Sequence, residues 1–270
     1  RDRSVSRGLG DVYKRQANLC TSTLYYDALL SAVSLGRELG VESAQTARYA
    51  AQARALARAI DAHFGGEVGG YDTYRYYAGN TLLRSWICMP LIVGLKERSE
   101  GTVRALLGPE LMTDDGLLTQ QGSSTFWDRS TLYALRGVYA SGETEKATGY
   151  LSYYSGVRLL GDHVPYPIEA WPEGSQRHLS AESGLYCRII TEGLFGIRPT
   201  GLRSFDLTPS MPAAWESMSL RHIRAFGSDF DITVARVADG RLRITVARPG
   251  AKPKIYRAAP GATIRVKLTD

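Results

Sequence analysis

The sequence has few cysteines and lacks the short motifs typical of a metal or nucleotide site. Its three cysteines, Cys20, Cys88 and Cys187, are far apart, odd in number and surrounded by apolar residues. This pattern predicts separate core thiols rather than a metal site or a disulfide set. No spacing resembles a zinc site, no glycine-rich phosphate loop follows a predicted strand, and no serine-centred elbow occurs. We therefore expect neither a metal nor a cofactor.

The sequence also lacks a long apolar run and a basic stripe. No stretch is apolar for long enough to span a bilayer, so we expect no membrane insertion. The 270 residues carry a formal net charge of +6, but half of that excess lies in residues 1–16, where five basic residues accompany two acidic ones. The other basic residues are scattered along the chain. We therefore expect no nucleic-acid partner, because nucleic-acid binding requires clustered positive charge.

We interpret residues 1–16 as a leader that is not part of the fold. They have no hydrophobic period and no apolar core of a signal peptide. They resemble the translated adapter sequence that precedes some bacterial gene models assembled from short metagenomic reads. We expect this leader to be non-native and the native chain to extend further toward the N-terminus. The sequence thus leaves the compartment open, and a periplasmic or secreted location is compatible with it.

The rest of the chain contains paired helices followed by short strands. Apolar periodicity and glycine stops predict helices over residues 17–39, 41–64, 81–94, 99–107, 126–140, 143–160 and 181–194. A loop is expected over 65–80, and Pro90 is expected to kink the third helix. After Pro199, β-branched alternation broken by turn signals predicts antiparallel strands. We expect a mainly α fold, with a toroid of helical hairpins over 17–198 and a small antiparallel β-sandwich over 199–270.

Four loops between these elements share tyrosine, tryptophan, acidic, arginine and glutamine residues. They lie at residues 71–77 leading to 84–86, 120–129, 163–182 and 198–204. Alternate loops of a toroid gather at one end of the ring, so we expect these four to surround one pocket. Their composition favours carbohydrate binding, because sugar ring faces stack on aromatic rings while charged and amide groups bind hydroxyls. The substrate-binding candidates are Tyr74, Arg75, Trp127, Arg129, Tyr166, Trp171, Glu173, Gln176, Arg177 and His178.

The third loop and the helix after it, residues 163–197, are the most informative part of the sequence. This stretch reads HVPYPIEAWPEGSQRHLSAESGLYCRIITEGLFGI and contains Glu169, Glu173 and Glu182. Carboxylates beside aromatic rings suit the acid–base chemistry of a sugar site. The alternative is a connecting loop whose acids are solvated and whose Trp171 fills a gap in the core.

The order of segments resembles the C-terminal half of the six-hairpin (α/α)6-toroid glycoside hydrolases, the group that includes trehalases and processing α-glucosidases. The likeness rests on the helical pair before Gly70-Tyr71, on FWDRSTLYALRGVYASGETEKA, on IEAWPEG, on LSAESGLYCRIITEGLFGI and on the strand segment FGSDFDITV. Residues 126–129, Phe-Trp-Asp-Arg, depart from the aromatic-Trp-Arg-Gly turn of that group. The resemblance covers about residues 17–270 and implies a partial (α/α)6 toroid followed by a β-sandwich.

The resemblance also implies an inverting, exo-acting glycoside hydrolase that acts on an oligosaccharide or glycan. In such enzymes one carboxylic acid protonates the leaving oxygen while a second carboxylate activates water. By position Glu169 matches the general base, with Glu182 and Glu173 as rivals. Glu182 begins a predicted helix, where the helix dipole alone favours an acid.

The general acid of that group lies upstream of the first helix of this chain. We therefore expect it to be absent here unless Asp72 or Asp128 serves, and the catalytic candidates are Glu169, Glu182 and Asp128. Two alternatives stay open. One is a sugar phosphorylase in which Arg177 and His178 bind phosphate, and the other is a non-catalytic carbohydrate-binding module.

Overall fold

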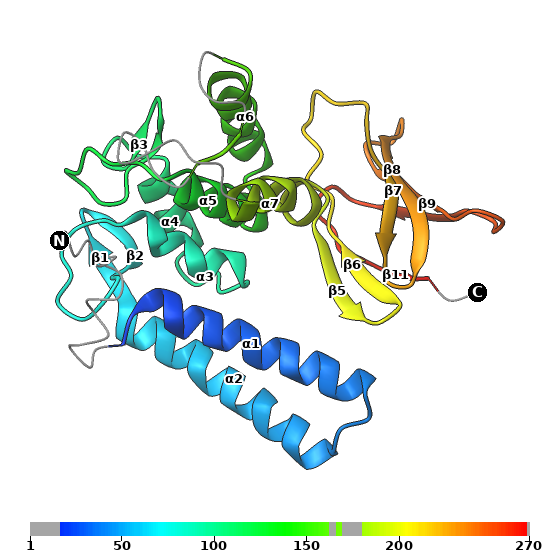
Figure 1. The fold of residues 1–270 in the computed structure, drawn as a ribbon, viewed down its shortest axis with the longest axis horizontal. Coiled ribbons are helices and arrows are strands. Elements are labelled where there is room, and N and C mark those ends of the chain that lie inside the picture. The colour runs from blue at the N-terminus through cyan, green and yellow to red at the C-terminus, as the bar shows by residue number, and fades with distance from the viewer. Residues whose placement is uncertain (1–16, 162–165, 169–179, 269–270) are drawn as a thin grey trace.

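The computed structural model describes residues 17–161, 166–168 and 180–268. Helices make up the first part of the chain and antiparallel strands the second (Figure 1). The expected order of helices followed by strands is therefore confirmed. Within the described part of the chain, no helix is both long and apolar enough to cross a bilayer.

The first two helices form a long antiparallel hairpin. They are α1 (Leu19–Glu38) and α2 (Ser43–Phe64), close to the expected ranges. The side chain of Asn18 caps α1 by accepting a hydrogen bond from the Thr21 N–H at 2.8 Å. Gly40 follows α1 with a φ of +66°, a left-handed conformation that glycine adopts without strain.

The region from residue 65 to residue 94 differs from the expectation. The expected loop contains a hairpin, β1 (Gly65–Val68) and β2 (Tyr71–Tyr74). Gly69 and Gly70 have φ values of +60° and +83°, which suit the two-residue turn that matches strand twist. The expected helix over 81–94 is reduced to the 3-10 turn η2 (Ser85–Cys88) and to α3 (Met89–Ile92). Pro90 lies in the first turn of α3, where its missing N–H costs no helical hydrogen bond.

The remaining helices lie where the periodicity places them. The structure contains α4 (Ser99–Leu106), α5 (Asp128–Ala140), α6 (Thr144–Tyr154) and α7 (Ser180–Arg188). Two of them continue as π-helical turns, η3 (Ser155–Leu159) after α6 and η4 (Ile189–Leu194) after α7. A small hairpin, β3 (Met112–Thr113) and β4 (Gly116–Leu117), precedes α5.

The contacts between the helices follow the order of the chain. Helix α3 lies between α1 and α5, and α5 in turn packs against α7 and η4. Helix α2 packs along α1, α4 packs against η2 and β2, and α6 packs against α5 (Figure 1). Helices α1, α3, α5 and α7 therefore follow one another in chain order.

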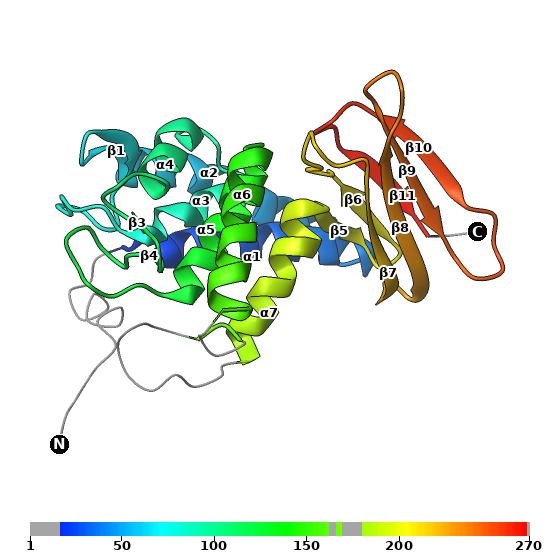
Figure 2. The same cartoon turned by 90° about the horizontal axis from the view of Figure 1, so that it is seen from above.

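The strands form two antiparallel sheets at the far end of the helices (Figure 2). The order of one sheet is β10-β9-β8-β7, with strands Lys254–Ala258, Leu242–Ala247, Ser228–Arg236 and Ser217–Ala225. The order of the other is β11-β6-β5, with strands Ile264–Lys267, Ser204–Leu207 and Ile197–Gly201. Phe205 of β6 stacks on Phe226 and Phe230, at centroid distances of 5.0 and 5.5 Å. The sheets therefore pack through apolar side chains, and one cluster of buried residues runs from the helices into both sheets.

The contact between α4 and the β1–β2 hairpin makes Gly101 a sensitive position. A Cβ at Gly101 would lie 2.0 Å from the backbone oxygen of Asp72, which cannot move aside alone, whereas one at Gly149 in α6 meets nothing within 4 Å. We expect Gly101→Ala to lower the free energy of unfolding by about 1–3 kcal/mol through overpacking. Gly149→Ala, also in a helix, should raise it by about 0.5–1 kcal/mol. Urea unfolding of both variants checks this, and equal effects would contradict the packing described for α4.

Candidate functional site

A buried ion pair joins the start of α5 to the end of the α6–η3 helix. The Asp128 side chain is 3% exposed and that of Arg158 is 4% exposed. The Arg158 guanidinium donates to both carboxylate oxygens of Asp128, at 3.1 and 3.2 Å. The Ile168 N–H also donates to Asp128 Oδ2, at 2.7 Å. Asp128 therefore connects two helices to residues 166–168 of the third loop.

These contacts argue against the catalytic role expected for Asp128. Burial raises the pKa of Asp128, whereas the Arg158 guanidinium and the Ile168 N–H act in the opposite direction. Both carboxylate oxygens already accept hydrogen bonds within the protein. This carboxylate is arranged to anchor a backbone segment, not to exchange protons with a ligand.

A second buried carboxylate joins the N-terminal ends of α5 and α7. Glu182, in the first turn of α7, is fully buried, and its Oε1 accepts a hydrogen bond from Arg129 Nε at 2.6 Å. Its other oxygen, Oε2, is buried and has no hydrogen-bond partner in the part of the chain that the structure describes. An unpaired oxygen on a buried carboxylate is costly. Within the described residues, Oε2 is therefore the oxygen of Glu182 that is still able to accept a hydrogen bond.

Aromatic rings lie beside these two ion pairs. Trp127 directly precedes α5, and its ring meets that of Trp86 edge to face at a centroid distance of 6.0 Å. The Tyr133 ring also lies 6.0 Å from that of Trp86, between ring centroids. Trp127 Nε1 is buried and has no acceptor among the described residues. The residue before α5 thus carries a buried N–H, and the first turn of α7 a buried carboxylate oxygen, that no described residue pairs.

Backbone contacts bring the first two loops together. Arg84 pairs with Gln120 as an isolated β-bridge, and the Ser85 N–H donates to the Thr119 oxygen at 3.3 Å. The third loop contacts the second loop, because the Ile168 N–H donates to Asp128. Three of the four loops expected to converge therefore do so in part.

Two expected binding residues of the first loop lie elsewhere. Tyr74 is 1% exposed and belongs to the core, because residues 71–74 form a strand that packs against α4. Arg75 Nη1 donates to the Gly65 oxygen at 2.8 Å, across the base of the hairpin. The sequence prediction that both residues line a sugar subsite does not fit these positions.

The fourth loop lies at the opposite end of α7. Arg198 Nη2 donates to the Ile92 oxygen at 2.5 Å, and the Leu202 N–H donates to Glu38 Oε2 at 3.1 Å. Glu182 begins the α7–η4 helix whereas Arg198 follows its end, about 20 Å away along the axis. The prediction that residues 198–204 join the other loops is therefore wrong.

Much of the third loop lies outside the described residues. Of its candidates, Tyr166 is described and is half-buried, next to the anchored segment that ends at Ile168. The candidates outside the described residues are Glu169, Trp171, Glu173, Gln176, Arg177 and His178.

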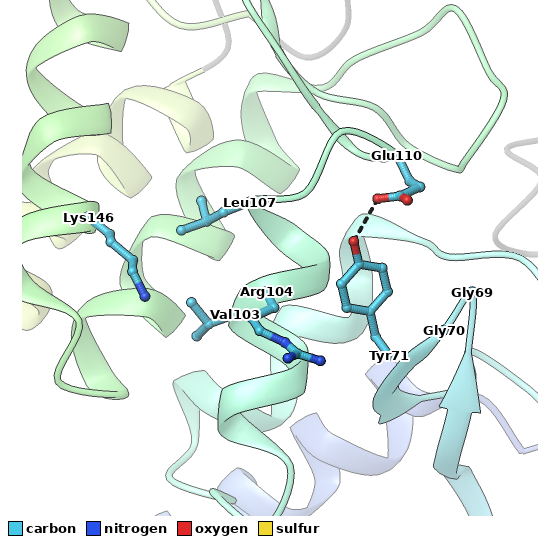
Figure 3. A pocket seen from close by; sticks show the side chains of 8 residues that line it. All are labelled: Gly69, Gly70, Tyr71, Val103, Arg104, Leu107, Glu110 and Lys146. Carbon is cyan, nitrogen blue, oxygen red and sulfur yellow. Dashed lines mark hydrogen bonds between the residues drawn. The ribbon is translucent and has the colours of Figure 1, made fainter.

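Two cavities of the described chain lie away from these residues. One, of about 640 Å³, lies between the β1–β2 turn, α4 and the start of α6 (Figure 3). There Tyr71 donates to Glu110 at 2.9 Å, and the Arg104 guanidinium lies 5.8 Å from the Tyr71 ring. The other, of about 800 Å³, lies between α1, α3 and β5. Sequence reasoning did not single out either cavity, because each combines residues from three or more distant elements.

No group of three or more metal-binding side chains occurs within residues 17–161, 166–168 and 180–268. Comparison with protein-family models yields no match, and comparison with curated proteins yields none either. Any function must therefore be argued from the side chains themselves.

Proposed function

We propose that the chain forms part of an (α/α)6 toroid that carries a carbohydrate-processing site. The arrangement of the helices supports the toroid, since α1, α3, α5 and α7 follow one another in chain order, while α2 packs along α1 and α6 packs against α5. The N-terminal ends of α5 and α7 meet through Arg129 and Glu182. A site at that end would be held by rigid helices rather than by loops alone.

The observation that carries the proposal is the pair of unsatisfied buried polar atoms, Glu182 Oε2 and Trp127 Nε1. A sugar hydroxyl both donates and accepts hydrogen bonds, so sugar hydroxyls can satisfy a carboxylate oxygen and an indole N–H. Aromatic rings next to such groups suit the apolar faces of a pyranose. The proposed activity is glycoside hydrolysis with inversion, acting from the end of an oligosaccharide or glycan.

In this proposal the three candidate carboxylates have different tasks. Asp128 holds the backbone at Ile168, and Glu169, the proposed general base, is the next residue in the sequence. Glu182 receives a substrate hydroxyl, and Arg129 keeps its carboxylate oriented. Glu182 is thus assigned to substrate binding, and the activation of water to Glu169.

Sugar binding tests the proposal directly. We expect at least one member of a panel of hexoses, 6-deoxyhexoses and disaccharides to bind in calorimetric titration. Glu182→Gln should weaken that binding by about ten- to a hundredfold, because a hydrogen bond to a charged group contributes about 1.5–3 kcal/mol.

Glu143→Gln is the matched control, since Glu143 pairs with Lys146 at the surface, at 2.9 Å. This variant should bind as the unaltered protein does. The proposal would be abandoned if no sugar of the panel bound, or if Glu182→Gln and Glu143→Gln gave equal affinities.

A further inference from the structure

The cavity of about 800 Å³ between α1, α3 and β5 has the size and the apolar lining of a ligand site. Ligand pockets usually measure about 300–1,000 Å³ and often lie where two parts of a fold meet. Here the helices meet the strands. Three leucines that line the cavity, Leu30, Leu35 and Leu202, are 39%, 53% and 56% exposed. Single exposed leucines are ordinary, but three around one cavity form a concave apolar wall that a ligand can cover.

Arg136, on α5, adds a buried cation to the lining of this cavity. The residue is only 6% exposed, and its Nε has no acceptor in the part of the chain that the structure describes. Burial lowers the pKa of Arg136 from its usual value, because the charged form loses hydration. A buried donor on a charged group that lacks a partner is costly. An acceptor oxygen on a ligand would therefore be bound favourably at this position.

The protein itself holds the Arg136 guanidinium in place. The guanidinium carbon lies 5.6 Å from the centre of the Tyr133 ring, and Nη2 donates a hydrogen bond to Glu192 of η4. The Glu192 carboxylate also accepts hydrogen bonds from Arg188, one of them at 3.1 Å. One carboxylate thus faces two guanidinium groups, which leaves positive charge in excess on this side of the cavity. Because Arg136 is oriented before a ligand arrives, little ordering is required on binding.

The other charged side chains of the cavity divide in the same way. Arg198, after η4, is a third cation in the lining, and its Nη2 donates to the Ile92 oxygen at 2.5 Å. The two remaining acids, Asp27 and Glu38, both lie on α1, and Glu38 Oε2 accepts a hydrogen bond from the Leu202 N–H at 3.1 Å. The arginines therefore come from α5, α7 and the start of β5, whereas these two acids come from α1. A negatively charged group is favoured on the side of the arginines.

We propose that this cavity binds a monocarboxylate with an unbranched apolar chain. Its carboxylate accepts a hydrogen bond from Arg136 Nε, and its chain lies against Leu30, Leu35 and Leu202. Arginine–carboxylate hydrogen bonds are among the strongest that proteins form, and the leucines add the burial of the chain. A compact inorganic anion would leave the apolar wall uncovered, and a neutral alcohol would lack the charge. The inference goes beyond the proposed sugar site and does not depend on it, because that site lies at the other end of the α7–η4 helix.

Calorimetric titration of the whole chain with butanoate, hexanoate and octanoate tests the proposal. We expect octanoate to bind, and the affinity to rise about three- to fourfold for each added CH₂ group, because each one buries more apolar surface. Octan-1-ol, which has the same chain without the charge, should bind about ten- to a hundredfold more weakly than octanoate. Absence of octanoate binding, equal affinities for butanoate and octanoate, or equal affinities for octanoate and octan-1-ol would overturn the proposal.

Arg136→Gln places the carboxylate in the cavity. This variant should weaken octanoate binding about ten- to a hundredfold and change octan-1-ol binding by no more than about twofold, since the alcohol does not use the charge. Arg104→Gln is the control, because Arg104 is exposed and lines the other cavity, and it should bind octanoate as the unaltered protein does. Equal octanoate affinities for the two variants would contradict the proposal.

A variant of the apolar wall keeps the test valid if Arg136→Gln fails to fold. Leu202 is exposed, so Leu202→Glu should leave the core intact. It places a negative charge beside the ligand chain and should weaken octanoate binding about tenfold or more. The matched control is Leu160→Glu, at a leucine that is 84% exposed and does not line this cavity. The proposal fails if both leucine variants bind octanoate equally well.

Discussion

Asp128→Ala is expected to lower the free energy of unfolding by about 3–5 kcal/mol, the cost typical of breaking a buried ion pair from one side. The substitution removes the acceptor for the Arg158 guanidinium and for the Ile168 N–H, and both donors lie in the protein interior. Urea unfolding at pH 7 measures the change. Asp206→Ala is the control, because Asp206 pairs with Arg265 at the surface, at 2.7 Å, and should cost less than about 1 kcal/mol.

The raised pKa of Asp128 sharpens this prediction. Because folding favours the protonated carboxyl, Asp128→Asn should cost much less than Asp128→Ala, since the amide oxygen still accepts from Ile168. A carboxyl group whose pKa is raised by folding stabilises the folded state most at low pH. This contribution to the free energy of unfolding is fully present below the usual carboxyl pKa of about 3.9, and it is lost as the pH rises through the higher pKa of the folded state. The stability of the unaltered protein relative to Asp128→Asn should therefore increase as the pH falls from 7 toward 4. The opposite trend, or a cost for Asp128→Ala no larger than for Asp206→Ala, would contradict this account of the pair.

The helices were predictable from the sequence because their signals are local. Apolar periodicity and glycine stops located α1, α2, α4, α5, α6 and α7 to within a few residues, apart from the π-helical turns after α6 and α7. The β1–β2 hairpin was missed although Gly69-Gly70 is a known hairpin signal, because aromatic and acidic residues around it suggested a binding loop. Once those residues pair as strands, the end of β2 packs into the core, where Tyr74 is buried.

The candidate site was predictable only in part. The sequence shows that residues 120–129 and 163–182 carry similar side chains, and the structure brings Asp128, Arg129, Ile168 and Glu182 together. The sequence cannot show that Arg158, 30 positions after Asp128, forms an ion pair with the Asp128 carboxylate. That contact depends on how helices pack, and no local pattern encodes it. The fourth loop was misplaced for a different reason. The sequence puts the third loop before the helix predicted over 181–194 and the fourth loop after it, so the two lie at opposite ends of that helix and are not alternate loops.

Glu169→Gln should lower the turnover of a glycosyl fluoride by about 10²–10⁴-fold, the contribution typical of a positioned general base. Fluoride departs without being protonated, so this substrate reports on the base alone and does not require a general acid. The assay uses the α- and β-fluorides of the sugar that binds, and fluoride release is followed with an ion-selective electrode. Glu173→Gln makes the same substitution four residues later and should change the rate by no more than a few-fold.

Azide adds a second measurement to the same experiment. It needs no base to attack the sugar, so it should restore turnover in Glu169→Gln and produce a glycosyl azide of inverted configuration. Glu182→Gln should not be rescued in this way, because in the proposed site that side chain binds a hydroxyl rather than activating water. Turnover that requires phosphate and is unaffected by Glu169→Gln would replace hydrolysis with phosphorolysis. Sugar binding without turnover in any variant would reduce the site to a carbohydrate-binding one.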